Sequence, residues 1–529
     1  MKKKIVLFTI LSINVSLFSQ DLSGALEGNN VRATISNTGL FFNDIDESRA
    51  GYESPKDEGN HLLYSTSFWF GAKDESGNIK MAANLYGGEY RDTYPGALKN
   101  DGTAEAPDTP YADEIYFVSK AEIEYHVANY YDPDYVTPHG IASWPAHGDV
   151  GMGMDDQLAP FADLNGNGIY EPESGEYPEI RGDHAAYLIM NDMAGPHTQS
   201  GGDPLGIEIH YMFYQYNTEY VINNTTFINV RVINRSSNNY PEFITSAYMR
   251  SYIGHYNDDY IGCNPAKNYM FGYNSDNVDE AGGLDPGYGE NPPAVGFLLL
   301  NHDMHVSGYF AHATGPFGVP NTAADFWNYQ NAIWKNGSPF QFGGNGNTTG
   351  SGEPTNFMYP SDPTLTEPDP DVWSERSEVN PGGSRRMHMS AAPISLAPGE
   401  VICYDFAVMT SSREGDNYEN ASSLADQADD IHAFYDMQPD LWCDFTLGIS
   451  EETPDEIDFR LFPNPASGMF TIDFEGSYQL QLFTMDGQLI FMKPNSVNKE
   501  IINVDLNSGI YLVRLVRDGK VYQNRLVVN

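Results

Sequence analysis

The chain has 529 residues, with 73 Asp and Glu against 28 Lys and Arg, which gives a formal net charge of −45 at pH 7. A negative field of this size repels nucleic acid and anionic lipid head groups and attracts divalent cations, so we expect no nucleic-acid partner. Hydrophobic residues make up 40% of the chain and aromatic residues 13%, which excludes an acidic disordered protein. Solubility in a salty medium and a specific need for cations explain the acidic excess equally well.

The amino terminus predicts export from the cytoplasm. Three lysines follow Met1, and an apolar run extends from Ile5 to Phe18. This pattern is typical of a secretory signal peptide and is too short to span a membrane, so we predict a signal peptide over residues 1–19. No later stretch holds about eighteen consecutive apolar residues, and we expect no transmembrane segment.

Residues 20–200 predict a loop-rich β lobe. The stretch 63–70 is rich in β-branched and aromatic residues and is closed by glycine, as strands often are. From 87 to 160 the chain is dense in Gly, Pro, Asp and Tyr, so we expect long loops with one short helix near 122–131.

The strongest candidate site follows at residues 163–176. Oxygen-bearing side chains at alternate positions, followed by glycine, allow a loop to curl around one hard cation. The predicted calcium ligands are the side chains of Asp163, Asn165, Asn167, Glu171 and Glu173 and the backbone carbonyl of Ile169.

This stretch resembles the calcium loops of EF-hands and dockerins at its start and departs from them at its end. The twelfth position is Ser174, where an EF-hand has Glu, so Glu171, Glu173 or Glu176 would have to replace it. Pro172 disfavours an entering helix, and we therefore expect a non-helical loop with structural calcium. The alternative is an Asn-Gly turn that only tolerates positive φ.

Residues 201–448 predict an antiparallel β-sandwich lobe. Apolar residues alternate along 206–213 and 226–233, and the run 401–409 follows a Gly/Asn/Pro-rich stretch that we read as a long surface excursion at 336–384. One amphipathic helix begins at Asp416, because Glu419 completes a capping box and apolar residues then recur at helical spacing.

Other candidate sites carry weaker signals. Two further clusters lie at Asn257-Asp258-Asp259 with Asp276 and 279–280, and at Asp183 with Asn191-Asp192. Either could bind a second ion, but we prefer to interpret both as solvated loops. Cys263, Cys403 and Cys443 are too scattered to form a disulfide framework or a zinc site, although two of them could pair. We find no G-x-S-x-G, H-E-x-x-H, Walker or C-x-x-C motif, while a distant carboxylate pair stays open.

Residues 457–529 differ from everything before them. They hold seven acidic and seven basic residues, and apolar residues alternate along runs separated by Asp-Gly pairs at 486–487 and 518–519. The pattern predicts a small Ig-like β-sandwich of roughly seven strands behind an acidic linker at 449–456.

The same residues resemble the type A C-terminal sorting domain of proteins exported by the Bacteroidota type IX secretion system. The resemblance rests on Leu-Phe-Pro-Asn-Pro-Ala-Ser-Gly at 461–468, on Met-Asp-Gly-Gln at 485–488 and on Leu-Asn-Ser-Gly-Ile-Tyr-Leu-Val-Arg at 506–514. It implies that the type IX machinery is a partner, that the product is secreted or held at the outer cell surface, and that a surface lipopolysaccharide link replaces the tail.

Together these features predict a mainly β protein with β-sandwich lobes, long loops, one amphipathic helix and a small C-terminal sandwich. We expect a calcium-stabilised β-protein with a binding, adhesive or structural role. The alternative is a polysaccharide-active enzyme or a carbohydrate-binding protein with an extracellular glycan as partner, and the sequence leaves catalysis undecided. Apart from its tail, the chain resembles only uncharacterised secreted proteins of the same system.

Overall fold

The computed structural model describes residues 21–438 and 459–528. Short gaps fall at 46, 89, 105–110, 219, 284, 366–369, 465, 467–468, 475, 485–488, 504–505, 507–508 and 518–519. The predicted signal peptide and the predicted linker lie outside the described residues. The chain divides into two compact units, a large one whose described part ends near Met437 and a small one formed by the C-terminal strands.

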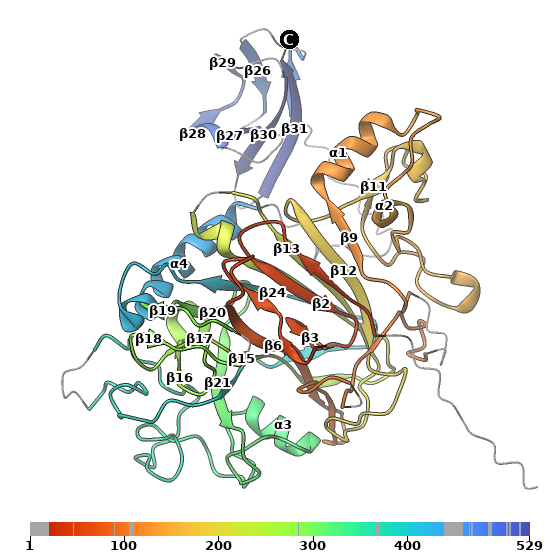
Figure 1. Ribbon diagram of the computed structural model, residues 1–529. Coiled ribbons are helices and arrows are strands. Elements are labelled where there is room, and N and C mark those ends of the chain that lie inside the picture. Colours follow the sequence, from red (N-terminus) through yellow and green to blue (C-terminus); the bar gives the residue numbers. More distant parts are fainter. Residues whose placement is uncertain are drawn as a thin grey trace, which may run out of the picture. The chain divides into compact units, whose positions relative to one another are not determined.

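Two large antiparallel sheets form the first unit (Figure 1). The first sheet has the order β1 (Ser23–Leu26), β2 (Arg32–Ser36), β5 (Tyr52–Glu53), β6 (His61–Lys73), β15 (Tyr240–Ser251), β22 (Arg385–Ala391) and β21 (Met304–Ala311), with β7 (Ile79–Ala82) on β6 and β23 (Ile394–Leu396) on β15.

The second sheet has the order β16 (Asp259–Asn264), β17 (Tyr269–Asn274), β20 (Ala294–Leu299), β24 (Val401–Thr410), β14 (Thr226–Asn234), β13 (Ile207–Gln215), β12 (His184–Asn191) and β8 (Tyr94–Pro95), with β9 (Tyr116–Ser119) also on β12. Three two-stranded ribbons accompany the sheets: β3 (Asn43–Asp44) with β4 (Arg49–Ala50), β10 (Phe161–Ala162) with β11 (Tyr177–Pro178), and β18 (Val278–Asp279) with β19 (Gly289–Glu290).

An aromatic core holds the two sheets face to face. The ring of Phe68 in β6 lies 5.6 Å from that of Tyr211 in β13 and 5.2 Å from that of Phe406 in β24. Successive side chains of a strand point to opposite faces, so Trp69 turns away from this core and packs at 4.9 Å against Phe326 of α3 (Ala323–Gln330). The first sheet is therefore buried on both faces.

The Gly/Asn/Pro-rich excursion covers that second face. It was expected to run over the surface, and residues 336–384 do lack strands in their described part. Phe340, Tyr359 and Trp373 are nevertheless fully buried. The irregular backbone here places aromatic side chains in the core. The glycine-rich composition of this stretch gave no indication of that burial.

Helices and loops cover the outer face of the second sheet. Helix α4 (Asn417–Met437) begins as predicted, with the backbone of Asp416 donating to Glu419 and the backbone of Glu419 donating to Asp416. Its apolar stripe, including Leu424 and Ile431, is buried. The other end of the sheet carries loops with α1 (Lys120–Asn129), where one helix was expected, and α2 (His139–Ala142).

We call residues 20–448, which precede the predicted linker and the C-terminal unit, the passenger. The structure corrects the predicted division of the passenger at residue 200. Strand β6, from the first predicted lobe, pairs along most of its length with β15 from the second. Strand β12 pairs with β13 across the same boundary. Both predicted lobes thus contribute to both sheets of one sandwich, and the sequence missed this because the β6–β15 pairing joins residues far apart in the chain.

The C-terminal unit is the small sandwich that the sequence predicts. Its two sheets have the orders β25 (Arg460–Phe462), β26 (Met469–Asp473), β29 (Glu500–Asn503), and β28 (Leu489–Val497), β27 (Ser477–Thr484), β30 (Gly509–Arg517), β31 (Lys520–Val528). The alternating residues Leu480, Leu482, Val513 and Leu515 are fully buried between them. Both Asp-Gly pairs lie outside the described residues, although the strands on either side of each pair with one another as hairpins do.

Candidate functional site

The predicted calcium loop leaves and re-enters a two-stranded ribbon. Strands β10 and β11 pair antiparallel, with Ala162 opposite Tyr177, so residues 163–176 form a closed excursion. Gly166 and Gly168 both have φ of +74°, a conformation that few other residues adopt without strain. One 3-10 turn at Pro172–Ser174 ends the excursion, and no α-helix enters it, as Pro172 led us to expect.

Asp163 organises the first half of this loop. Its Oδ1 accepts hydrogen bonds from the backbone of Gly166 at 2.7 Å and Asn167 at 3.2 Å, and its Oδ2 accepts one from Gly168 at 2.7 Å. The bond from Gly168, together with those from Gly166 and Asn167, lowers the pKa of the Asp163 carboxyl, so it is ionised at neutral pH. The loop thus curls around one carboxylate.

The second half of the loop brings a further carboxylate to the same place. Glu171 Oε2 accepts from the side-chain amides of Asn165 at 2.9 Å and Asn167 at 2.7 Å. Glu176 is fully buried, and its two carboxylate oxygens accept from the backbone of Leu164 at 3.1 Å and of Glu171 at 2.8 Å. These are the oxygen donors that hard cations such as calcium prefer.

Of the six predicted ligands, the structure brings four together: Asp163, Asn165, Asn167 and Glu171. The Ile169 backbone nitrogen donates to Asn167 at 2.7 Å, which keeps this residue on the rim of the loop. Glu173 is exposed, and among the described residues it makes no hydrogen bond to the loop. Glu176 turns into the loop instead, whereas the 3-10 turn carries Glu173 outward.

Helix α1 packs against this loop. The His126 ring in α1 contacts the Glu176 carbonyl oxygen at 3.1 Å through Nε2. Gly175 has no room for a side chain, because an added Cβ would lie 2.7 Å from the ring of Tyr130. The position of α1 therefore depends on the backbone that carries Glu176.

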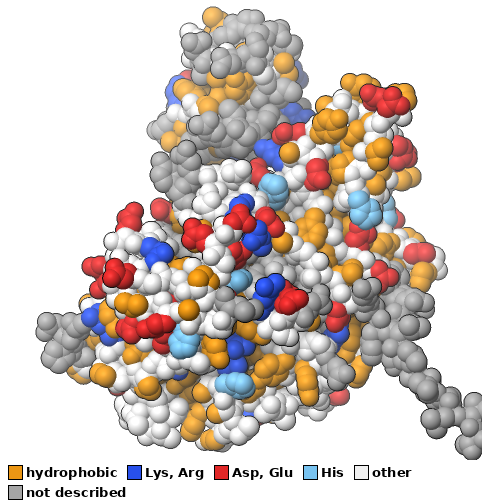
Figure 2. Space-filling view, viewed as in Figure 1, with side chains coloured by type: hydrophobic (Ala, Val, Ile, Leu, Met, Phe, Trp, Pro, Cys, Tyr) orange, Lys and Arg blue, Asp and Glu red, His pale blue; other side chains and the backbone are white. Residues whose placement is uncertain are grey.

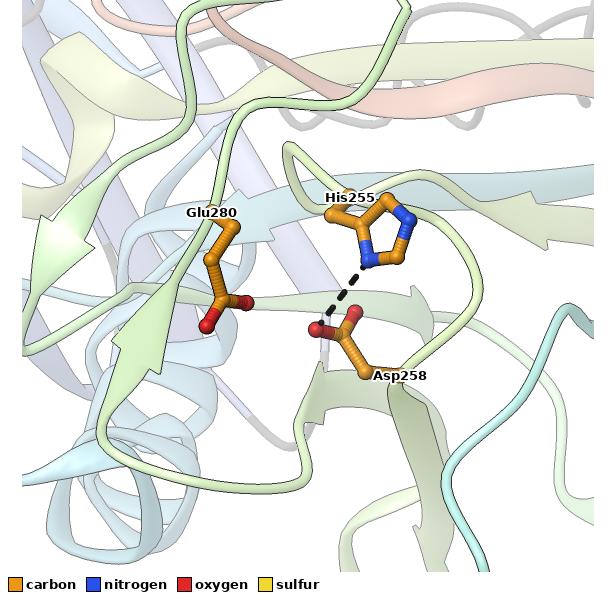
Figure 3. A group of neighbouring side chains, drawn as sticks. All are labelled: His255, Asp258 and Glu280. Atoms are coloured by element: carbon orange, nitrogen blue, oxygen red, sulfur yellow. Dashed lines mark hydrogen bonds and ion pairs between the residues drawn. The ribbon is translucent and has the colours of Figure 1, made fainter.

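The first of the two weaker acidic clusters does assemble. Asp258 and Glu280 come together, and His255 joins them, with one ligand atom from each residue lying within 4.8 Å of the others (Figure 3). Asp276 lies outside this group. The sequence reading missed His255, although an imidazole three residues before Asp258 was the signal that could have found it.

The prediction that Asp183 groups with Asn191 and Asp192 is wrong. Asp183 precedes β12 and Asp192 follows it, so an eight-residue strand separates them. The backbone nitrogens of Leu205, Gly206 and Ile207 donate to the carboxylate of Asp192, which is buried. This carboxylate is a structural acceptor.

Glu208 of β13 centres a buried charged network. Its Oε1 accepts from Arg235 at 2.8 Å and lies 3.0 Å from Nε2 of His210, and its Oε2 accepts from the backbone of Leu98 at 2.6 Å. Burial alone would raise the pKa of Glu208, but the contacts to His210 and Arg235 outweigh it and lower the pKa to about 2. His210 is thus a core histidine with a carboxylate partner.

This network predicts an acid-sensitive step in stability. The pKa of Glu208 in the folded state lies below its ordinary value of 4.5, so the ionised form stabilises the fold above pH 4.5. That stability is lost as the pH falls from 4.5 toward 2. We expect Glu208→Gln to lower the free energy of unfolding at pH 7 by about 3 kcal/mol and to flatten its pH dependence in this window. Urea unfolding over a pH series measures both effects, and Glu290→Gln, at an exposed glutamate, is the control. If Glu208→Gln left the loss of stability between pH 4.5 and 2 unchanged, Glu208 would not be its source.

Comparison with known proteins identifies only the C-terminal unit. Residues 460–529 match the model of the secretion system C-terminal sorting domain. No curated protein matches the chain in sequence. A solved structure described as an aldose 1-epimerase of Escherichia coli K12 aligns over 74% of this chain and 99% of its own, at 9% identity and a TM-score of 0.24. A polysaccharide lyase aligns over 87% of this chain and 46% of its own, at 8% identity and a TM-score of 0.19. Likenesses this weak carry no argument.

The sorting-domain match agrees with the structure of the tail. The matched residues begin at Arg460, the first residue of β25, and they extend through β31. Among the residues that the structure describes, no helix combines the length and apolar character that crossing a membrane requires. The chain therefore carries a secretion system C-terminal sorting domain at residues 460–529, and it is a secreted or cell-surface protein sorted by the type IX system.

Proposed function

We propose that the passenger, residues 20–448, is a calcium-stabilised extracellular β-sandwich that acts by binding other molecules. The observation that carries this proposal is the convergence of Asp163, Asn165, Asn167, Glu171 and Glu176 in one closed loop. Three carboxylates and two amides suit a hard cation. The acidic charge of the chain and its extracellular destination, where calcium is abundant, support the same role.

Export of this passenger depends on the C-terminal unit. Deleting residues 457–529 removes strands β25–β31 of the second compact unit and leaves both sheets of the passenger sandwich complete, so the fold should survive. We expect the truncated protein to be retained in the periplasm, while the full chain reaches the medium or the cell surface. Fractionation and immunoblotting measure this, and fusion of residues 449–529 to a periplasmic reporter is the matched control. A truncated protein that still reaches the exterior would contradict the assignment.

Tyrosines in α1 and in the segment that follows it favour a glycan as the molecule bound. We call Tyr125, Tyr130, Tyr131 and Tyr135 the tyrosine surface. Tyr125 is 60% exposed and Tyr131 is 74% exposed, and the rings of Tyr130 and Tyr131 lie 5.5 Å apart. Hydrophobic side chains gather on the projection that carries α1 (Figure 2). A tyrosine ring joins an apolar face to a hydroxyl, which suits it to binding surfaces and to stacking against sugar rings.

A glycan array with added calcium, run beside a polysaccharide-degradation screen, tests this function. We expect Tyr125→Ala and Tyr131→Ala each to lower the affinity for a glycan found on the array by about fivefold to thirtyfold, the range of 1–2 kcal/mol typical of exposed aromatic anchors. Tyr86→Ala is the control, because Tyr86 is also exposed but lies outside the tyrosine surface. Release of sugar products would favour the polysaccharide-active enzyme instead, and an array without binding would count against the glycan.

A further inference from the structure

His255, Asp258 and Glu280 meet where the chain passes from one sheet to the other. His255 and Asp258 lie in the turn between β15 of the first sheet and β16 of the second, and Glu280 follows β18. Figure 3 shows the carboxylate of Asp258 between the imidazole of His255 and the carboxylate of Glu280. The three side chains thus converge from two separate segments.

The spacing of these atoms fits shared ligation better than direct hydrogen bonding. His255 Nδ1 lies 3.4 Å from Asp258 Oδ2, whereas a charge-assisted N–H···O bond is typically about 2.7–2.9 Å long. Two donors that each lie about 2.1 Å from one zinc ion at a tetrahedral angle are about 3.4 Å apart. The pair is therefore set at the distance that a common metal ion requires.

Four carboxyl groups, those of Asp258, Asp259, Asp279 and Glu280, gather here, and His255 is the ion-pair partner of Asp258. Asp258 Oδ1 and Asp259 Oδ1 are buried without a hydrogen-bond partner, and the side chain of Asp259 is fully buried. Asp279, which directly precedes Glu280 in the chain, is also buried. Among the described residues, no Lys or Arg forms an ion pair with any of these four carboxylates. Unpaired buried charge is costly, so a bound cation would relieve it.

A second set of contacts fixes the backbone at His255. Asp279 Oδ1 accepts from the His255 backbone at 2.8 Å. Gly254 has φ of +53°, and a Cβ there would lie 1.9 Å from Asp279 Oδ2, so only glycine lets this carboxylate approach. These contacts hold the backbone from which the His255 side chain extends.

We propose that His255, Asp258 and Glu280 bind a divalent transition-metal ion such as zinc, at a site separate from the calcium loop. One imidazole with carboxylate oxygens is a ligand set for zinc and its neighbours, whereas calcium takes oxygen ligands alone. Three protein ligands leave one tetrahedral position for solvent or a bound molecule, and Glu280 lies on the exposed side. The proposed metal site depends neither on calcium binding by the loop nor on glycan binding by the tyrosine surface.

Metal titration of the full chain, prepared without a histidine tag and in excess calcium, tests the proposal. Cobalt(II) serves as a visible probe of nitrogen and oxygen ligation, and equilibrium dialysis with zinc gives stoichiometry and affinity. We expect one equivalent at this site, and we expect His255→Gln and Glu280→Gln to lower the affinity at least about tenfold to a hundredfold, since even outer partners contribute this much.

Two variants outside the group serve as matched controls. His432→Gln in α4 and Glu290→Gln in β19 remove the same chemical groups and should leave metal binding unchanged. Because Glu280 is exposed, its variant should fold normally and can decide the question even if His255→Gln does not fold. A wild-type chain that takes up no cobalt or zinc, or an affinity unchanged in Glu280→Gln, would overturn the site.

Discussion

Glu176→Gln is expected to abolish the rise in melting temperature that calcium gives the wild-type protein. Glu176 is buried, and it closes the loop by accepting from the backbone of Leu164 and of Glu171. Glutamine keeps the shape of the side chain but removes the negative charge that would face the ion. Calcium at a hundred times its dissociation constant should stabilise the wild type by about 2.7 kcal/mol. A chain of this size should then melt a few degrees higher in calcium than in chelator.

Glu173→Gln is the matched control, because Glu173 lies in the same loop and was a predicted ligand, yet its side chain is exposed. We expect this variant to keep the full calcium-dependent shift. Scanning calorimetry of the three proteins, each in calcium and in chelator, measures the differences. Equal calcium-dependent shifts in melting temperature in both variants would contradict a role for Glu176 in calcium binding. A wild-type protein without such a shift would contradict calcium binding by the loop itself.

The sequence predicted those parts of the molecule that depend on local pattern. Alternating apolar residues placed β13 and β14, and the capping box of Asp416 and Glu419 placed the start of α4. The tail was predicted in most detail, because β27 pairs with β28 and β30 pairs with β31, and in each pair the second strand follows the first directly in the chain. Each of these features is set by residues close together in the chain.

Features that depend on distant residues were missed. The pairing of β6 with β15 joined two predicted lobes into one sandwich, and no local pattern encodes which strands become partners. The candidate site shows the same limit, since spacing placed Asp163, Asn165 and Asn167 in one loop but predicted Glu173 as a ligand, where the structure turns Glu176 inward. This difference follows from the 3-10 turn and the β10–β11 ribbon, which together decide which carboxylate faces inward.

Asp405→Ala is expected to produce the largest loss of stability among single substitutions considered for this chain. Asp405 in β24 is buried, and its Oδ1 accepts from Arg181 at 2.9 Å and from the Asn229 amide at 2.8 Å. Its Oδ2 accepts from the hydroxyl of Tyr435 in α4 at 2.6 Å. Removing the carboxylate leaves the buried Arg181 charge without this counter-ion, which typically costs about 3–5 kcal/mol. Denaturant unfolding followed by circular dichroism measures the change.

An exposed ion pair of α4 provides the control for this prediction. Lys267 and Asp429 also link α4 to the sandwich, but Asp429 is 62% exposed, so Asp429→Ala should cost at most about 1 kcal/mol. Replacing both buried partners, as in Arg181→Met with Asp405→Leu, should recover much of the loss, because apolar groups of similar size leave no charge unpaired. A loss for Asp405→Ala no larger than that for Asp429→Ala would mean that the apolar stripe alone holds α4. The contrast therefore separates anchoring by charge from anchoring by packing.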